Sequence, residues 1–380
     1  MSSVVNYGPA HPAVHGALRL ILDVNGEDIN DIVPDIGYMH RGIESLIEQH
    51  IYSEVLPFLD RVDYVSAVAQ EYSYVLAVEK LLDLTVPERA QYIRVMIAEM
   101  TRIANHLLHV NMLTYDTGAL TPFVWAMEER EKIMWLFEEI CGARLHLNYF
   151  RIGGVANNIS EKSLSDILNW LPHLLVVIDD IENVITHSRI FINRTRGIGI
   201  ITKDLALAYG VTGSALRASG IKWDLRKKSP YDVYNKMDFK IPTGNFGDCY
   251  DRYLIKIQEI RESAKIVKQC IETIPEGEYI AQDKRYIPPQ AIKHGDTMFH
   301  VKHYVTGFTV PRGTIYMATE SPKGEFGILL ISNNSNKPLR CHIRSAGFPL
   351  MTLIKQITKR MADLPVILAS LDIVLGEVDR

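Results

Sequence analysis

The sequence predicts an α+β fold, with a central bundle of long helices between β-rich N-terminal and C-terminal portions. Three observations predict it. Pro57, Pro87 and Pro122 each stand just inside the start of a long segment with helical apolar periodicity. Short β-prone runs occupy both ends of the chain, and no repeat, low-complexity tract or polar linker divides its 380 residues. We therefore expect one compact unit.

Residues 1–41 are predicted to form short strands and a loop. The run 18–24 is β-prone, Asn25-Gly26 is a dipeptide typical of hairpin turns, and a second β-prone run follows at 29–33. From about Gly42 the apolar pattern becomes helical. We therefore expect a small β-rich portion ahead of the helices.

Residues 42–274 are predicted to form the helical core. Apolar side chains recur at helical spacing in five segments, near 57–83, 87–114, 122–142, 163–192 and 248–272. A proline in the first turn of a helix loses no hydrogen bond, because the N–H at that position has no partner within the helix. Pro172 lies inside the fourth segment, where it predicts a kink.

Residues 275–345 are predicted to be β-rich, and residues 346–380 to form a last helix and an apolar tail. Three β-prone runs separated by turn residues predict strands near 313–318, 326–331 and 339–344. The helix is expected near 349–361 and the tail over 364–374.

Composition excludes several classes of protein. The net charge is only -4, so the basic footprint of a nucleic-acid-binding protein is missing. No 18 consecutive residues are apolar, so the chain is not expected to span a membrane by itself. No nucleotide-binding glycine motif and no H-E-x-x-H occurs. The four cysteines form no C-x-x-C pair, which favours buried thiols over disulfides or a thiolate metal site.

Two histidines in a loop rich in Gly and Pro are the first candidate site. His11 and His15 stand four residues apart, but Pro12 and the flanking glycines indicate a loop, which disfavours shared metal coordination. A loop histidine is well suited to meet a ligand. The alternative is a solvated histidine without a function.

Arg61 and Tyr64 stand three residues apart within the segment 57–83 and predict a partly buried polar site on one helix face. The alternative is an ion pair of Arg61 with Asp60 or Asp63.

Three further features are less specific. Asp116 is expected just beyond a long helix, where an acidic residue is ordinarily structural. His146 has an arginine on each side and is followed by Gly153-Gly154, a combination that is distinctive but does not identify a role. Residues 128–132, with sequence EEREK, predict a solvated helix face with i,i+4 ion pairs.

Taken together, these segments resemble the large quinone-site subunit of respiratory complex I, the 49-kDa subunit family, called NADH dehydrogenase subunit 7 where mitochondria encode it. The resemblance covers essentially the whole chain in order, and Ala10 is a small departure, because many members carry Gln there. The matching motifs include Gly8-Pro-Ala-His-Pro-Ala-Val-His-Gly16, Ile36-Gly-Tyr-Met-His-Arg-Gly-Ile-Glu44, Asp60-Arg-Val-Asp-Tyr64, Arg151-Ile-Gly-Gly-Val155, Glu320-Ser-Pro-Lys-Gly-Glu325 and Leu371-Asp-Ile-Val-Leu-Gly-Glu-Val-Asp-Arg380.

The family is similar in fold to the large subunit of nickel–iron hydrogenases, which hold their metal with two C-x-x-C pairs. Neither end of this chain carries such a pair, so a nickel–iron centre is excluded. The resemblance implies that quinone enters the cavity where the hydrogenases have their metal.

The resemblance also implies residue roles at the quinone. His15 and Tyr64 match the pair that hydrogen-bonds the quinone head group, and Asp116 matches the carboxylate that partners the histidine. A histidine backed by a carboxylate and a tyrosine hydroxyl are suitable proton donors to the two carbonyl oxygens.

Further roles follow from the same resemblance. Arg61 and His146 match residues beside the terminal [4Fe–4S] cluster, which a neighbouring subunit binds. Asp372 and Val374 match tail residues that wall the quinone cavity, and Arg41 matches an arginine that is methylated in mitochondrial members.

The implied function is that of a core subunit of proton-pumping NADH:quinone oxidoreductase, active only within the complex. Quinone is the expected substrate, and this chain alone holds no cofactor. The expected partners are the small subunit with the terminal cluster and the membrane subunit at the arm junction. The expected location is peripheral, on the matrix side of the mitochondrial inner membrane or the cytoplasmic side of a bacterial one. The alternatives are a ferredoxin- or deazaflavin-fed complex and a non-catalytic scaffold.

Overall fold

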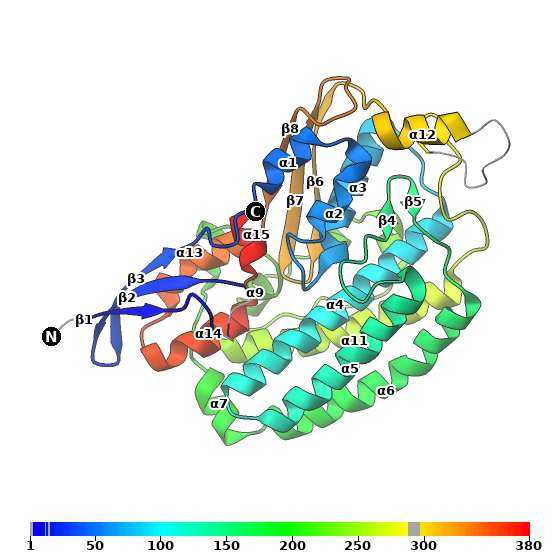
Figure 1. Ribbon diagram of the computed structural model, residues 1–380. Coiled ribbons are helices and arrows are strands. Elements are labelled where there is room, and N and C mark those ends of the chain that lie inside the picture. Colours follow the sequence, from blue (N-terminus) through cyan, green and yellow to red (C-terminus); the bar gives the residue numbers. More distant parts are fainter. Residues whose placement is uncertain (1–2, 12, 14–15, 288–296) are drawn as a thin grey trace.

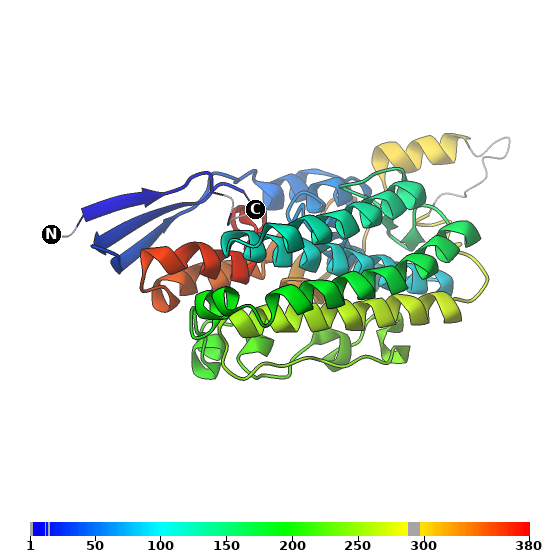
Figure 2. The same ribbon diagram turned by 90° about the horizontal axis from the view of Figure 1, so that it is seen from below.

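Four long helices form the centre of the molecule (Figure 1). The computed structural model describes residues 3–11, 13, 16–287 and 297–380. Helix α4 (Glu88–Asp116) packs against α5 (Leu120–Cys141) and α11 (Cys249–Thr273), and α6 (Glu161–Ile185) packs against α5 and α11. The views in Figures 1 and 2 show these helices side by side along their lengths. Three of the predicted long helices, α4, α5 and α11, are confirmed, as is the α+β class.

A three-stranded antiparallel sheet of β1 (Ser3–Tyr7), β2 (Arg19–Asn25) and β3 (Asp28–Asp35) extends from one end of the bundle (Figure 2). Leu20 and Leu22 of β2 are fully buried, as period-2 alternation requires. The predicted hairpin is confirmed, with Gly26 in the left-handed region at φ 66°. Strand β1 was not predicted, because its residues are largely exposed and carry no alternating apolar pattern.

A second antiparallel sheet consists of β6 (Gly313–Ser321), β7 (Gly324–Ser332) and β8 (Arg340–Arg344), in that order. It packs against α3 (Ala67–Leu82). All three strands were predicted. The tight turn between β6 and β7 carries Lys323 into the interior, where its side chain is buried. A small hairpin of β4 (Phe150–Arg151) and β5 (Gly154–Val155) lies beside α3 and α4.

The predicted helix near 57–83 is confirmed over Ala67–Leu82, but its first part is wrong. The segment divides into α2 (Leu56–Leu59) and α3, with a loop at 60–66 between them. The carboxylate of Asp63 accepts hydrogen bonds from the N–H of Val65 at 3.1 Å and from the hydroxyl of Ser66, which favours a turn over continued helix. Arg61 and Tyr64 therefore lie on a loop, and the expected shared helix face does not exist.

Two other predictions need correction. The segment 163–192 contains two helices, because α6 ends at Ile185 and the Ser188 side chain caps a new helix, α7 (Arg189–Thr195). The predicted solvated face at 128–132 is wrong for Glu129, which is buried. Its carboxylate accepts from Trp170 Nε1 at 2.9 Å and from Lys132 Nζ at 2.7 Å, and so joins α5 to α6.

The C-terminal part of the chain folds back into the core. Here α13 (Gly347–Ile357), α14 (Leu364–Leu371) and α15 (Leu375–Asp379) form, so the predicted apolar tail is mostly helical and buried. Helix α12 (Thr297–Thr306) lies in a portion predicted as β-rich. The remaining short helices are α1 (Ile43–Gln49), α8 (Lys203–Ala208), α9 (Gly213–Ala218) and α10 (Leu225–Lys228), with 3-10 turns at Tyr52–Glu54, Asp232–Lys236 and Met361–Asp363.

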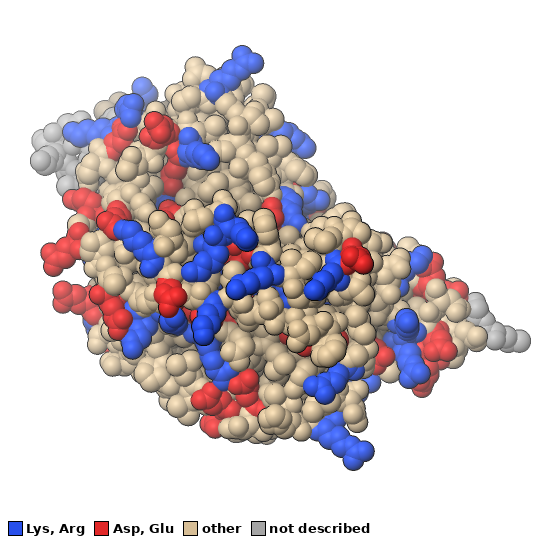
Figure 3. Space-filling model, turned by 180° about the vertical axis from the view of Figure 1, so that it is seen from behind, with Lys and Arg blue, Asp and Glu red and all other residues tan. Residues whose placement is uncertain are grey.

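The surface charges and the helix lengths describe how the chain can contact water, partner proteins or a membrane. Figure 3 shows that acidic and basic side chains are interspersed on one face and adjoin each other in several places. Among the described residues, every helix is too short or too polar to cross a lipid bilayer.

Candidate functional site

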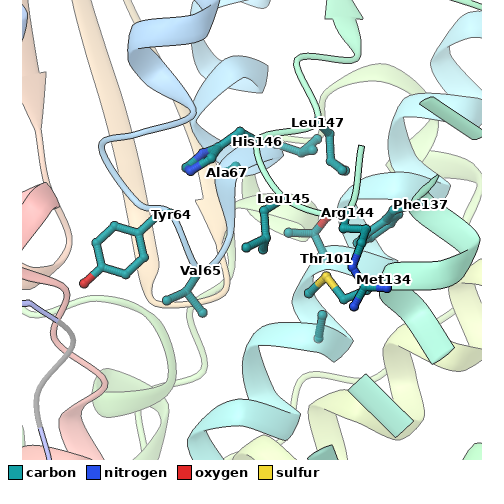
Figure 4. Close-up of a pocket in the computed structure, with 12 residues that line it drawn as sticks. Tyr64, Val65, Ala67, Thr101, Met134, Phe137, Arg144, Leu145, His146 and Leu147 are labelled. Atoms are coloured by element: carbon teal, nitrogen blue, oxygen red, sulfur yellow. The ribbon is translucent and has the colours of Figure 1, made fainter. Parts of the chain in front are cut away.

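A pocket lies beside loop 60–66, between that loop, helices α4 and α5, and the segment that follows α5 (Figure 4). Tyr64 and His146 lie at one side of it, and Arg144 and Met134 at the other. Its lining is otherwise largely apolar and includes Val65, Val68, Phe137 and Leu145. The structure therefore brings Tyr64 and His146, which are far apart in sequence, to one pocket.

The Tyr64 hydroxyl marks the point where three distant segments meet. A Cβ placed on Gly16 would lie 3.3 Å from Tyr64 Oη and 3.0 Å from Leu375 Cβ. Gly16 has φ 109°, which only glycine adopts readily, so both space and backbone geometry require glycine there. Val374 packs with Val65 in an apolar cluster against which Tyr64 also packs. The first loop, loop 60–66 and the C-terminal tail thus share one small region.

The charges around Tyr64 favour its protonated form. Burial, followed by the negative charge of Asp63, raises the pKa of Tyr64 to about 12, and the positive charge of Arg41 opposes this. The hydroxyl therefore stays protonated at neutral pH and can donate a hydrogen bond. Arg41 also lies close to Arg61, and its guanidinium donates to the carbonyl of Gly376 at 3.4 Å.

Asp116 is the last residue of α4, rather than a residue beyond it, and its charge acts on Tyr7 at the start of the first loop. Its Oδ2 is buried without a hydrogen-bond donor among the described residues, and burial raises the pKa of Asp116 to about 6. Burial and then the negative charge of Asp116 raise the pKa of Tyr7, whose hydroxyl lies 2.8 Å from His11 Nδ1. His15 lies outside the described residues, so its predicted contacts with Asp116 and Tyr64 stay predictions.

Arg61 and His146 both lie beside Asp60. The guanidinium of Arg61 is exposed and donates to the carbonyl of Pro57 at 2.7 Å. Among the described residues, Arg61 forms no ion pair with Asp60 or Asp63, so that alternative is wrong. His146 Nδ1 lies 3.3 Å from the carbonyl oxygen of Asp60, and His146 is partly buried.

A cluster of buried ions lies behind the Tyr64 loop. Lys323 Nζ is 2.9 Å from Asp63 Oδ2 and also donates to Asn105 Oδ1. Asn105 Nδ2 and Lys256 Nζ each donate to Asp372 Oδ2 at 2.8 Å. All five side chains are almost completely buried. We call Asp63, Asn105, Lys256, Lys323 and Asp372 the lysine cluster.

The lysine cluster binds the carboxylate of Asp372, whereas Val374 lies against the apolar neighbours of Tyr64. Their expected role as walls of a quinone cavity stays a prediction. The lysines themselves were not identified from the sequence. Lys323 stands in a turn motif, Ser321-Pro-Lys-Gly324, where a surface position is the ordinary expectation, and Lys256 lies on a helix rich in charged residues. No local signal marks either as buried.

Comparisons with known proteins agree with the motifs. Residues 116–380 match the family of the respiratory-chain NADH dehydrogenase 49 kDa subunit. The chain belongs to this family. An NADH-quinone oxidoreductase subunit from Ehrlichia ruminantium strain Welgevonden is 48% identical, over 99% of this chain and 97% of that protein. The subunits of the same name from Rickettsia typhi and from Wolbachia of Brugia malayi are each 47% identical, over 99% of this chain and 98% of those proteins.

Membership in the 49 kDa subunit family confirms the resemblance stated from the motifs. The relatives named here are bacterial, so a mitochondrial origin has no support from them.

The lysine cluster generates a prediction on stability. Lys323→Met leaves Asp63 buried without its nearest cation, which should cost about 3–5 kcal/mol of stability. Thermal unfolding of the purified protein should show a lower midpoint. The double variant Asp63→Asn/Lys323→Met removes both charges, so it should lose less stability than the two single variants together. Additive losses would mean that the two side chains do not act as a pair.

Proposed function

We propose that this chain is the core subunit of a proton-pumping NADH:quinone oxidoreductase that forms the quinone-binding cavity next to the terminal [4Fe–4S] cluster of a partner subunit. The observation that carries the proposal is that Gly16 lies against both the Tyr64 hydroxyl and Leu375, next to a largely apolar pocket that Tyr64 helps to line. An apolar pocket with a few convergent polar groups is the usual setting for a small organic ligand.

The chemistry of quinone reduction explains why donors are needed there. The reaction adds two electrons and two protons, and an unprotonated dianion in an apolar cavity would be very costly. Tyr64, whose hydroxyl keeps its proton at neutral pH, donates to one carbonyl oxygen of the head group. His15 donates to the other, and Asp116 holds the imidazole in orientation.

Asp116 suits this role because its buried carboxylate oxygen lacks another donor among the described residues. An imidazolium is a natural partner for such a group, since a buried negative charge is stabilised by a hydrogen-bonded cation. Arg41, close to Tyr64, adds positive charge that stabilises the negative charge developing on the head group as it gains electrons.

Arg61 and His146 are proposed to lie beside the cluster of the partner subunit. The ligands of the cluster are proposed to come from the partner subunit. When bound beside this chain, the cluster supplies single electrons. The fixed charge of Arg61 favours its reduced form.

The proposed partners are the small subunit that carries the cluster and the membrane subunit at the arm junction, with a peripheral location at the membrane. Support comes from helix α5, where Leu120, Val124 and Trp135 are exposed at 60%, 52% and 71%. Large exposed apolar side chains on one helix are typical of a protein–protein contact.

Replacement of Tyr64 by Phe tests the proposed proton donor. The change removes only the hydroxyl, so assembly should be retained, while quinone reductase activity should fall roughly 100-fold. NADH oxidation with an artificial acceptor that takes electrons upstream of quinone should be unchanged. Parallel loss of both activities and of assembled complex would make Tyr64 a structural residue.

Asp116 generates a prediction on pH dependence. Its pKa is raised to about 6 by burial, so the carboxylate loses its charge as the pH falls through about 6. Quinone reductase activity of the parent complex should therefore decline in that range, relative to the activity with the artificial acceptor. Asp116→Asn is neutral at every pH, so it should be less active at neutral pH and lack this decline. An unchanged acid limb in the variant would assign the titration to another group.

A further inference from the structure

Two buried carboxyl groups, Asp60 and Glu71, face each other behind the segment that carries His146. Asp60 directly follows α2, Glu71 lies on α3, and both side chains are 0% exposed. One oxygen of each accepts a backbone N–H: Asn148 N donates to Asp60 Oδ2 at 2.9 Å, and Phe150 N donates to Glu71 Oε2 at 2.8 Å. The two carboxyl groups lie next to each other, and each acts on the pKa of the other.

The remaining oxygens decide the protonation of the pair. Asp60 Oδ1 and Glu71 Oε1 are buried, and neither has any other hydrogen-bond donor among the described residues. Two carboxylate oxygens that face each other can form a hydrogen bond only when one of them carries a proton. Two adjacent buried carboxylates would also repel each other strongly, so one proton is retained at neutral pH.

The positive charges around the pair are not sufficient to keep both carboxyl groups ionised. Arg61 and His146 face Asp60, and Arg151 faces Glu71. Arg151 Nη1 donates to the carbonyls of Asn148 and Phe150 rather than to a carboxylate. The Cys141 thiol, also near Asp60, is uncharged at neutral pH because burial raises its pKa. Burial therefore dominates and raises the pKa of both carboxyl groups.

The pair also binds a piece of backbone with an uncommon conformation. His146 and Asn148 have positive φ values of 53° and 40°, a region that few non-glycine residues adopt, Asn and His more often than most. The N–H groups of Asn148 and Phe150 are bound by Asp60 and Glu71, and the carbonyl of Asp60 lies 3.3 Å from His146 Nδ1. The acid pair is thus connected directly to the position of the imidazole.

We propose that Asp60 and Glu71 form a proton-binding pair that shares one proton, positions His146, and takes up a second proton when negative charge is added on the His146 side. The proposal rests on the proposed function, in which His146 lies beside the cluster of the partner subunit. One electron arrives from upstream in the complex, and one proton comes from water. The pair changes from a charge of −1 to 0, and no other bond forms or breaks.

Infrared difference spectroscopy on the assembled complex, reduced minus oxidised, tests this assignment. The parent should gain a C=O stretching band of a protonated carboxylic acid on reduction, and the band should shift in deuterated water. Glu71→Gln and Asp60→Asn keep a hydrogen-bonding side chain at each position but remove one carboxyl group, so the band should be lost. The dependence of the cluster potential on pH, followed by electron paramagnetic resonance, should become weaker in both variants. Glu138→Gln, an exposed carboxylate on α5, should behave as the parent does.

Three outcomes would overturn the assignment: a parent complex without a gained carboxylic-acid band, a band that persists in Glu71→Gln or Asp60→Asn, or a band lost equally in Glu138→Gln. The difference spectrum of the parent complex tests proton uptake by a carboxyl group even if a variant does not assemble. Tyr64→Phe separates this question from the proposed function, because it should keep the band while losing quinone reduction. Full quinone reduction in Tyr64→Phe would contradict the proposed quinone site and leave the acid pair to be judged by its own band.

Discussion

The ion pair between Lys323 and Asp63 is the interaction on which the arrangement of the site depends. Lys323 lies in the turn between β6 and β7, and Asp63 lies in loop 60–66. Asp372 lies in the C-terminal tail and is bound by Asn105 and Lys256, and Asn105 also accepts a hydrogen bond from Lys323. These segments lie far apart in sequence, and buried charges tolerate little displacement, because each would lose its partner at high cost. The cluster therefore fixes loop 60–66 against the tail. Tyr64 and Val374 pack in one apolar cluster as a consequence.

Tyr64 and Asp116, the two groups of the proposed quinone site that the structure describes, each have a defined electrostatic setting. Tyr64 remains protonated because it is half-buried beside Asp63, whereas Asp116 is poised to change charge near pH 6 because burial raises its pKa and disfavours its ionised form. The two groups therefore differ in kind: one is a permanent hydrogen-bond donor and the other is a carboxylate whose charge needs a cationic partner. At the start of the same loop, Asp60 together with Glu71 keeps a proton away from water. One loop thus carries both Tyr64, the proposed proton donor to quinone, and part of a buried acid pair.

The sequence alone predicted the helices whose apolar periodicity is long and regular, such as Glu88–Asp116, and the strands β6 and β7. The helix prediction failed at 60–66, because the Asp63 carboxylate binds the N–H of Val65 and the hydroxyl of Ser66 in its own loop. Such hydrogen bonds compete with helix formation, and the spacing of apolar residues does not reveal them. Tyr64, Asp116 and His146 were singled out by local sequence features, but their expected roles came only from the family motifs. Lys323, Lys256 and Glu71 could not be found this way, since burial of a charged residue depends on contacts between distant segments.

The central claim is that a quinone head group binds at the Tyr64 hydroxyl, in the region where the first loop, loop 60–66 and the tail meet. A structure of the assembled complex with a bound quinone tests it most directly. The account predicts one carbonyl oxygen of the head group within hydrogen-bond distance of Tyr64 Oη, and the other facing His15 with Asp116 behind it. A head group bound elsewhere, with the Tyr64 hydroxyl still beside Gly16 and making no contact with quinone, would contradict it.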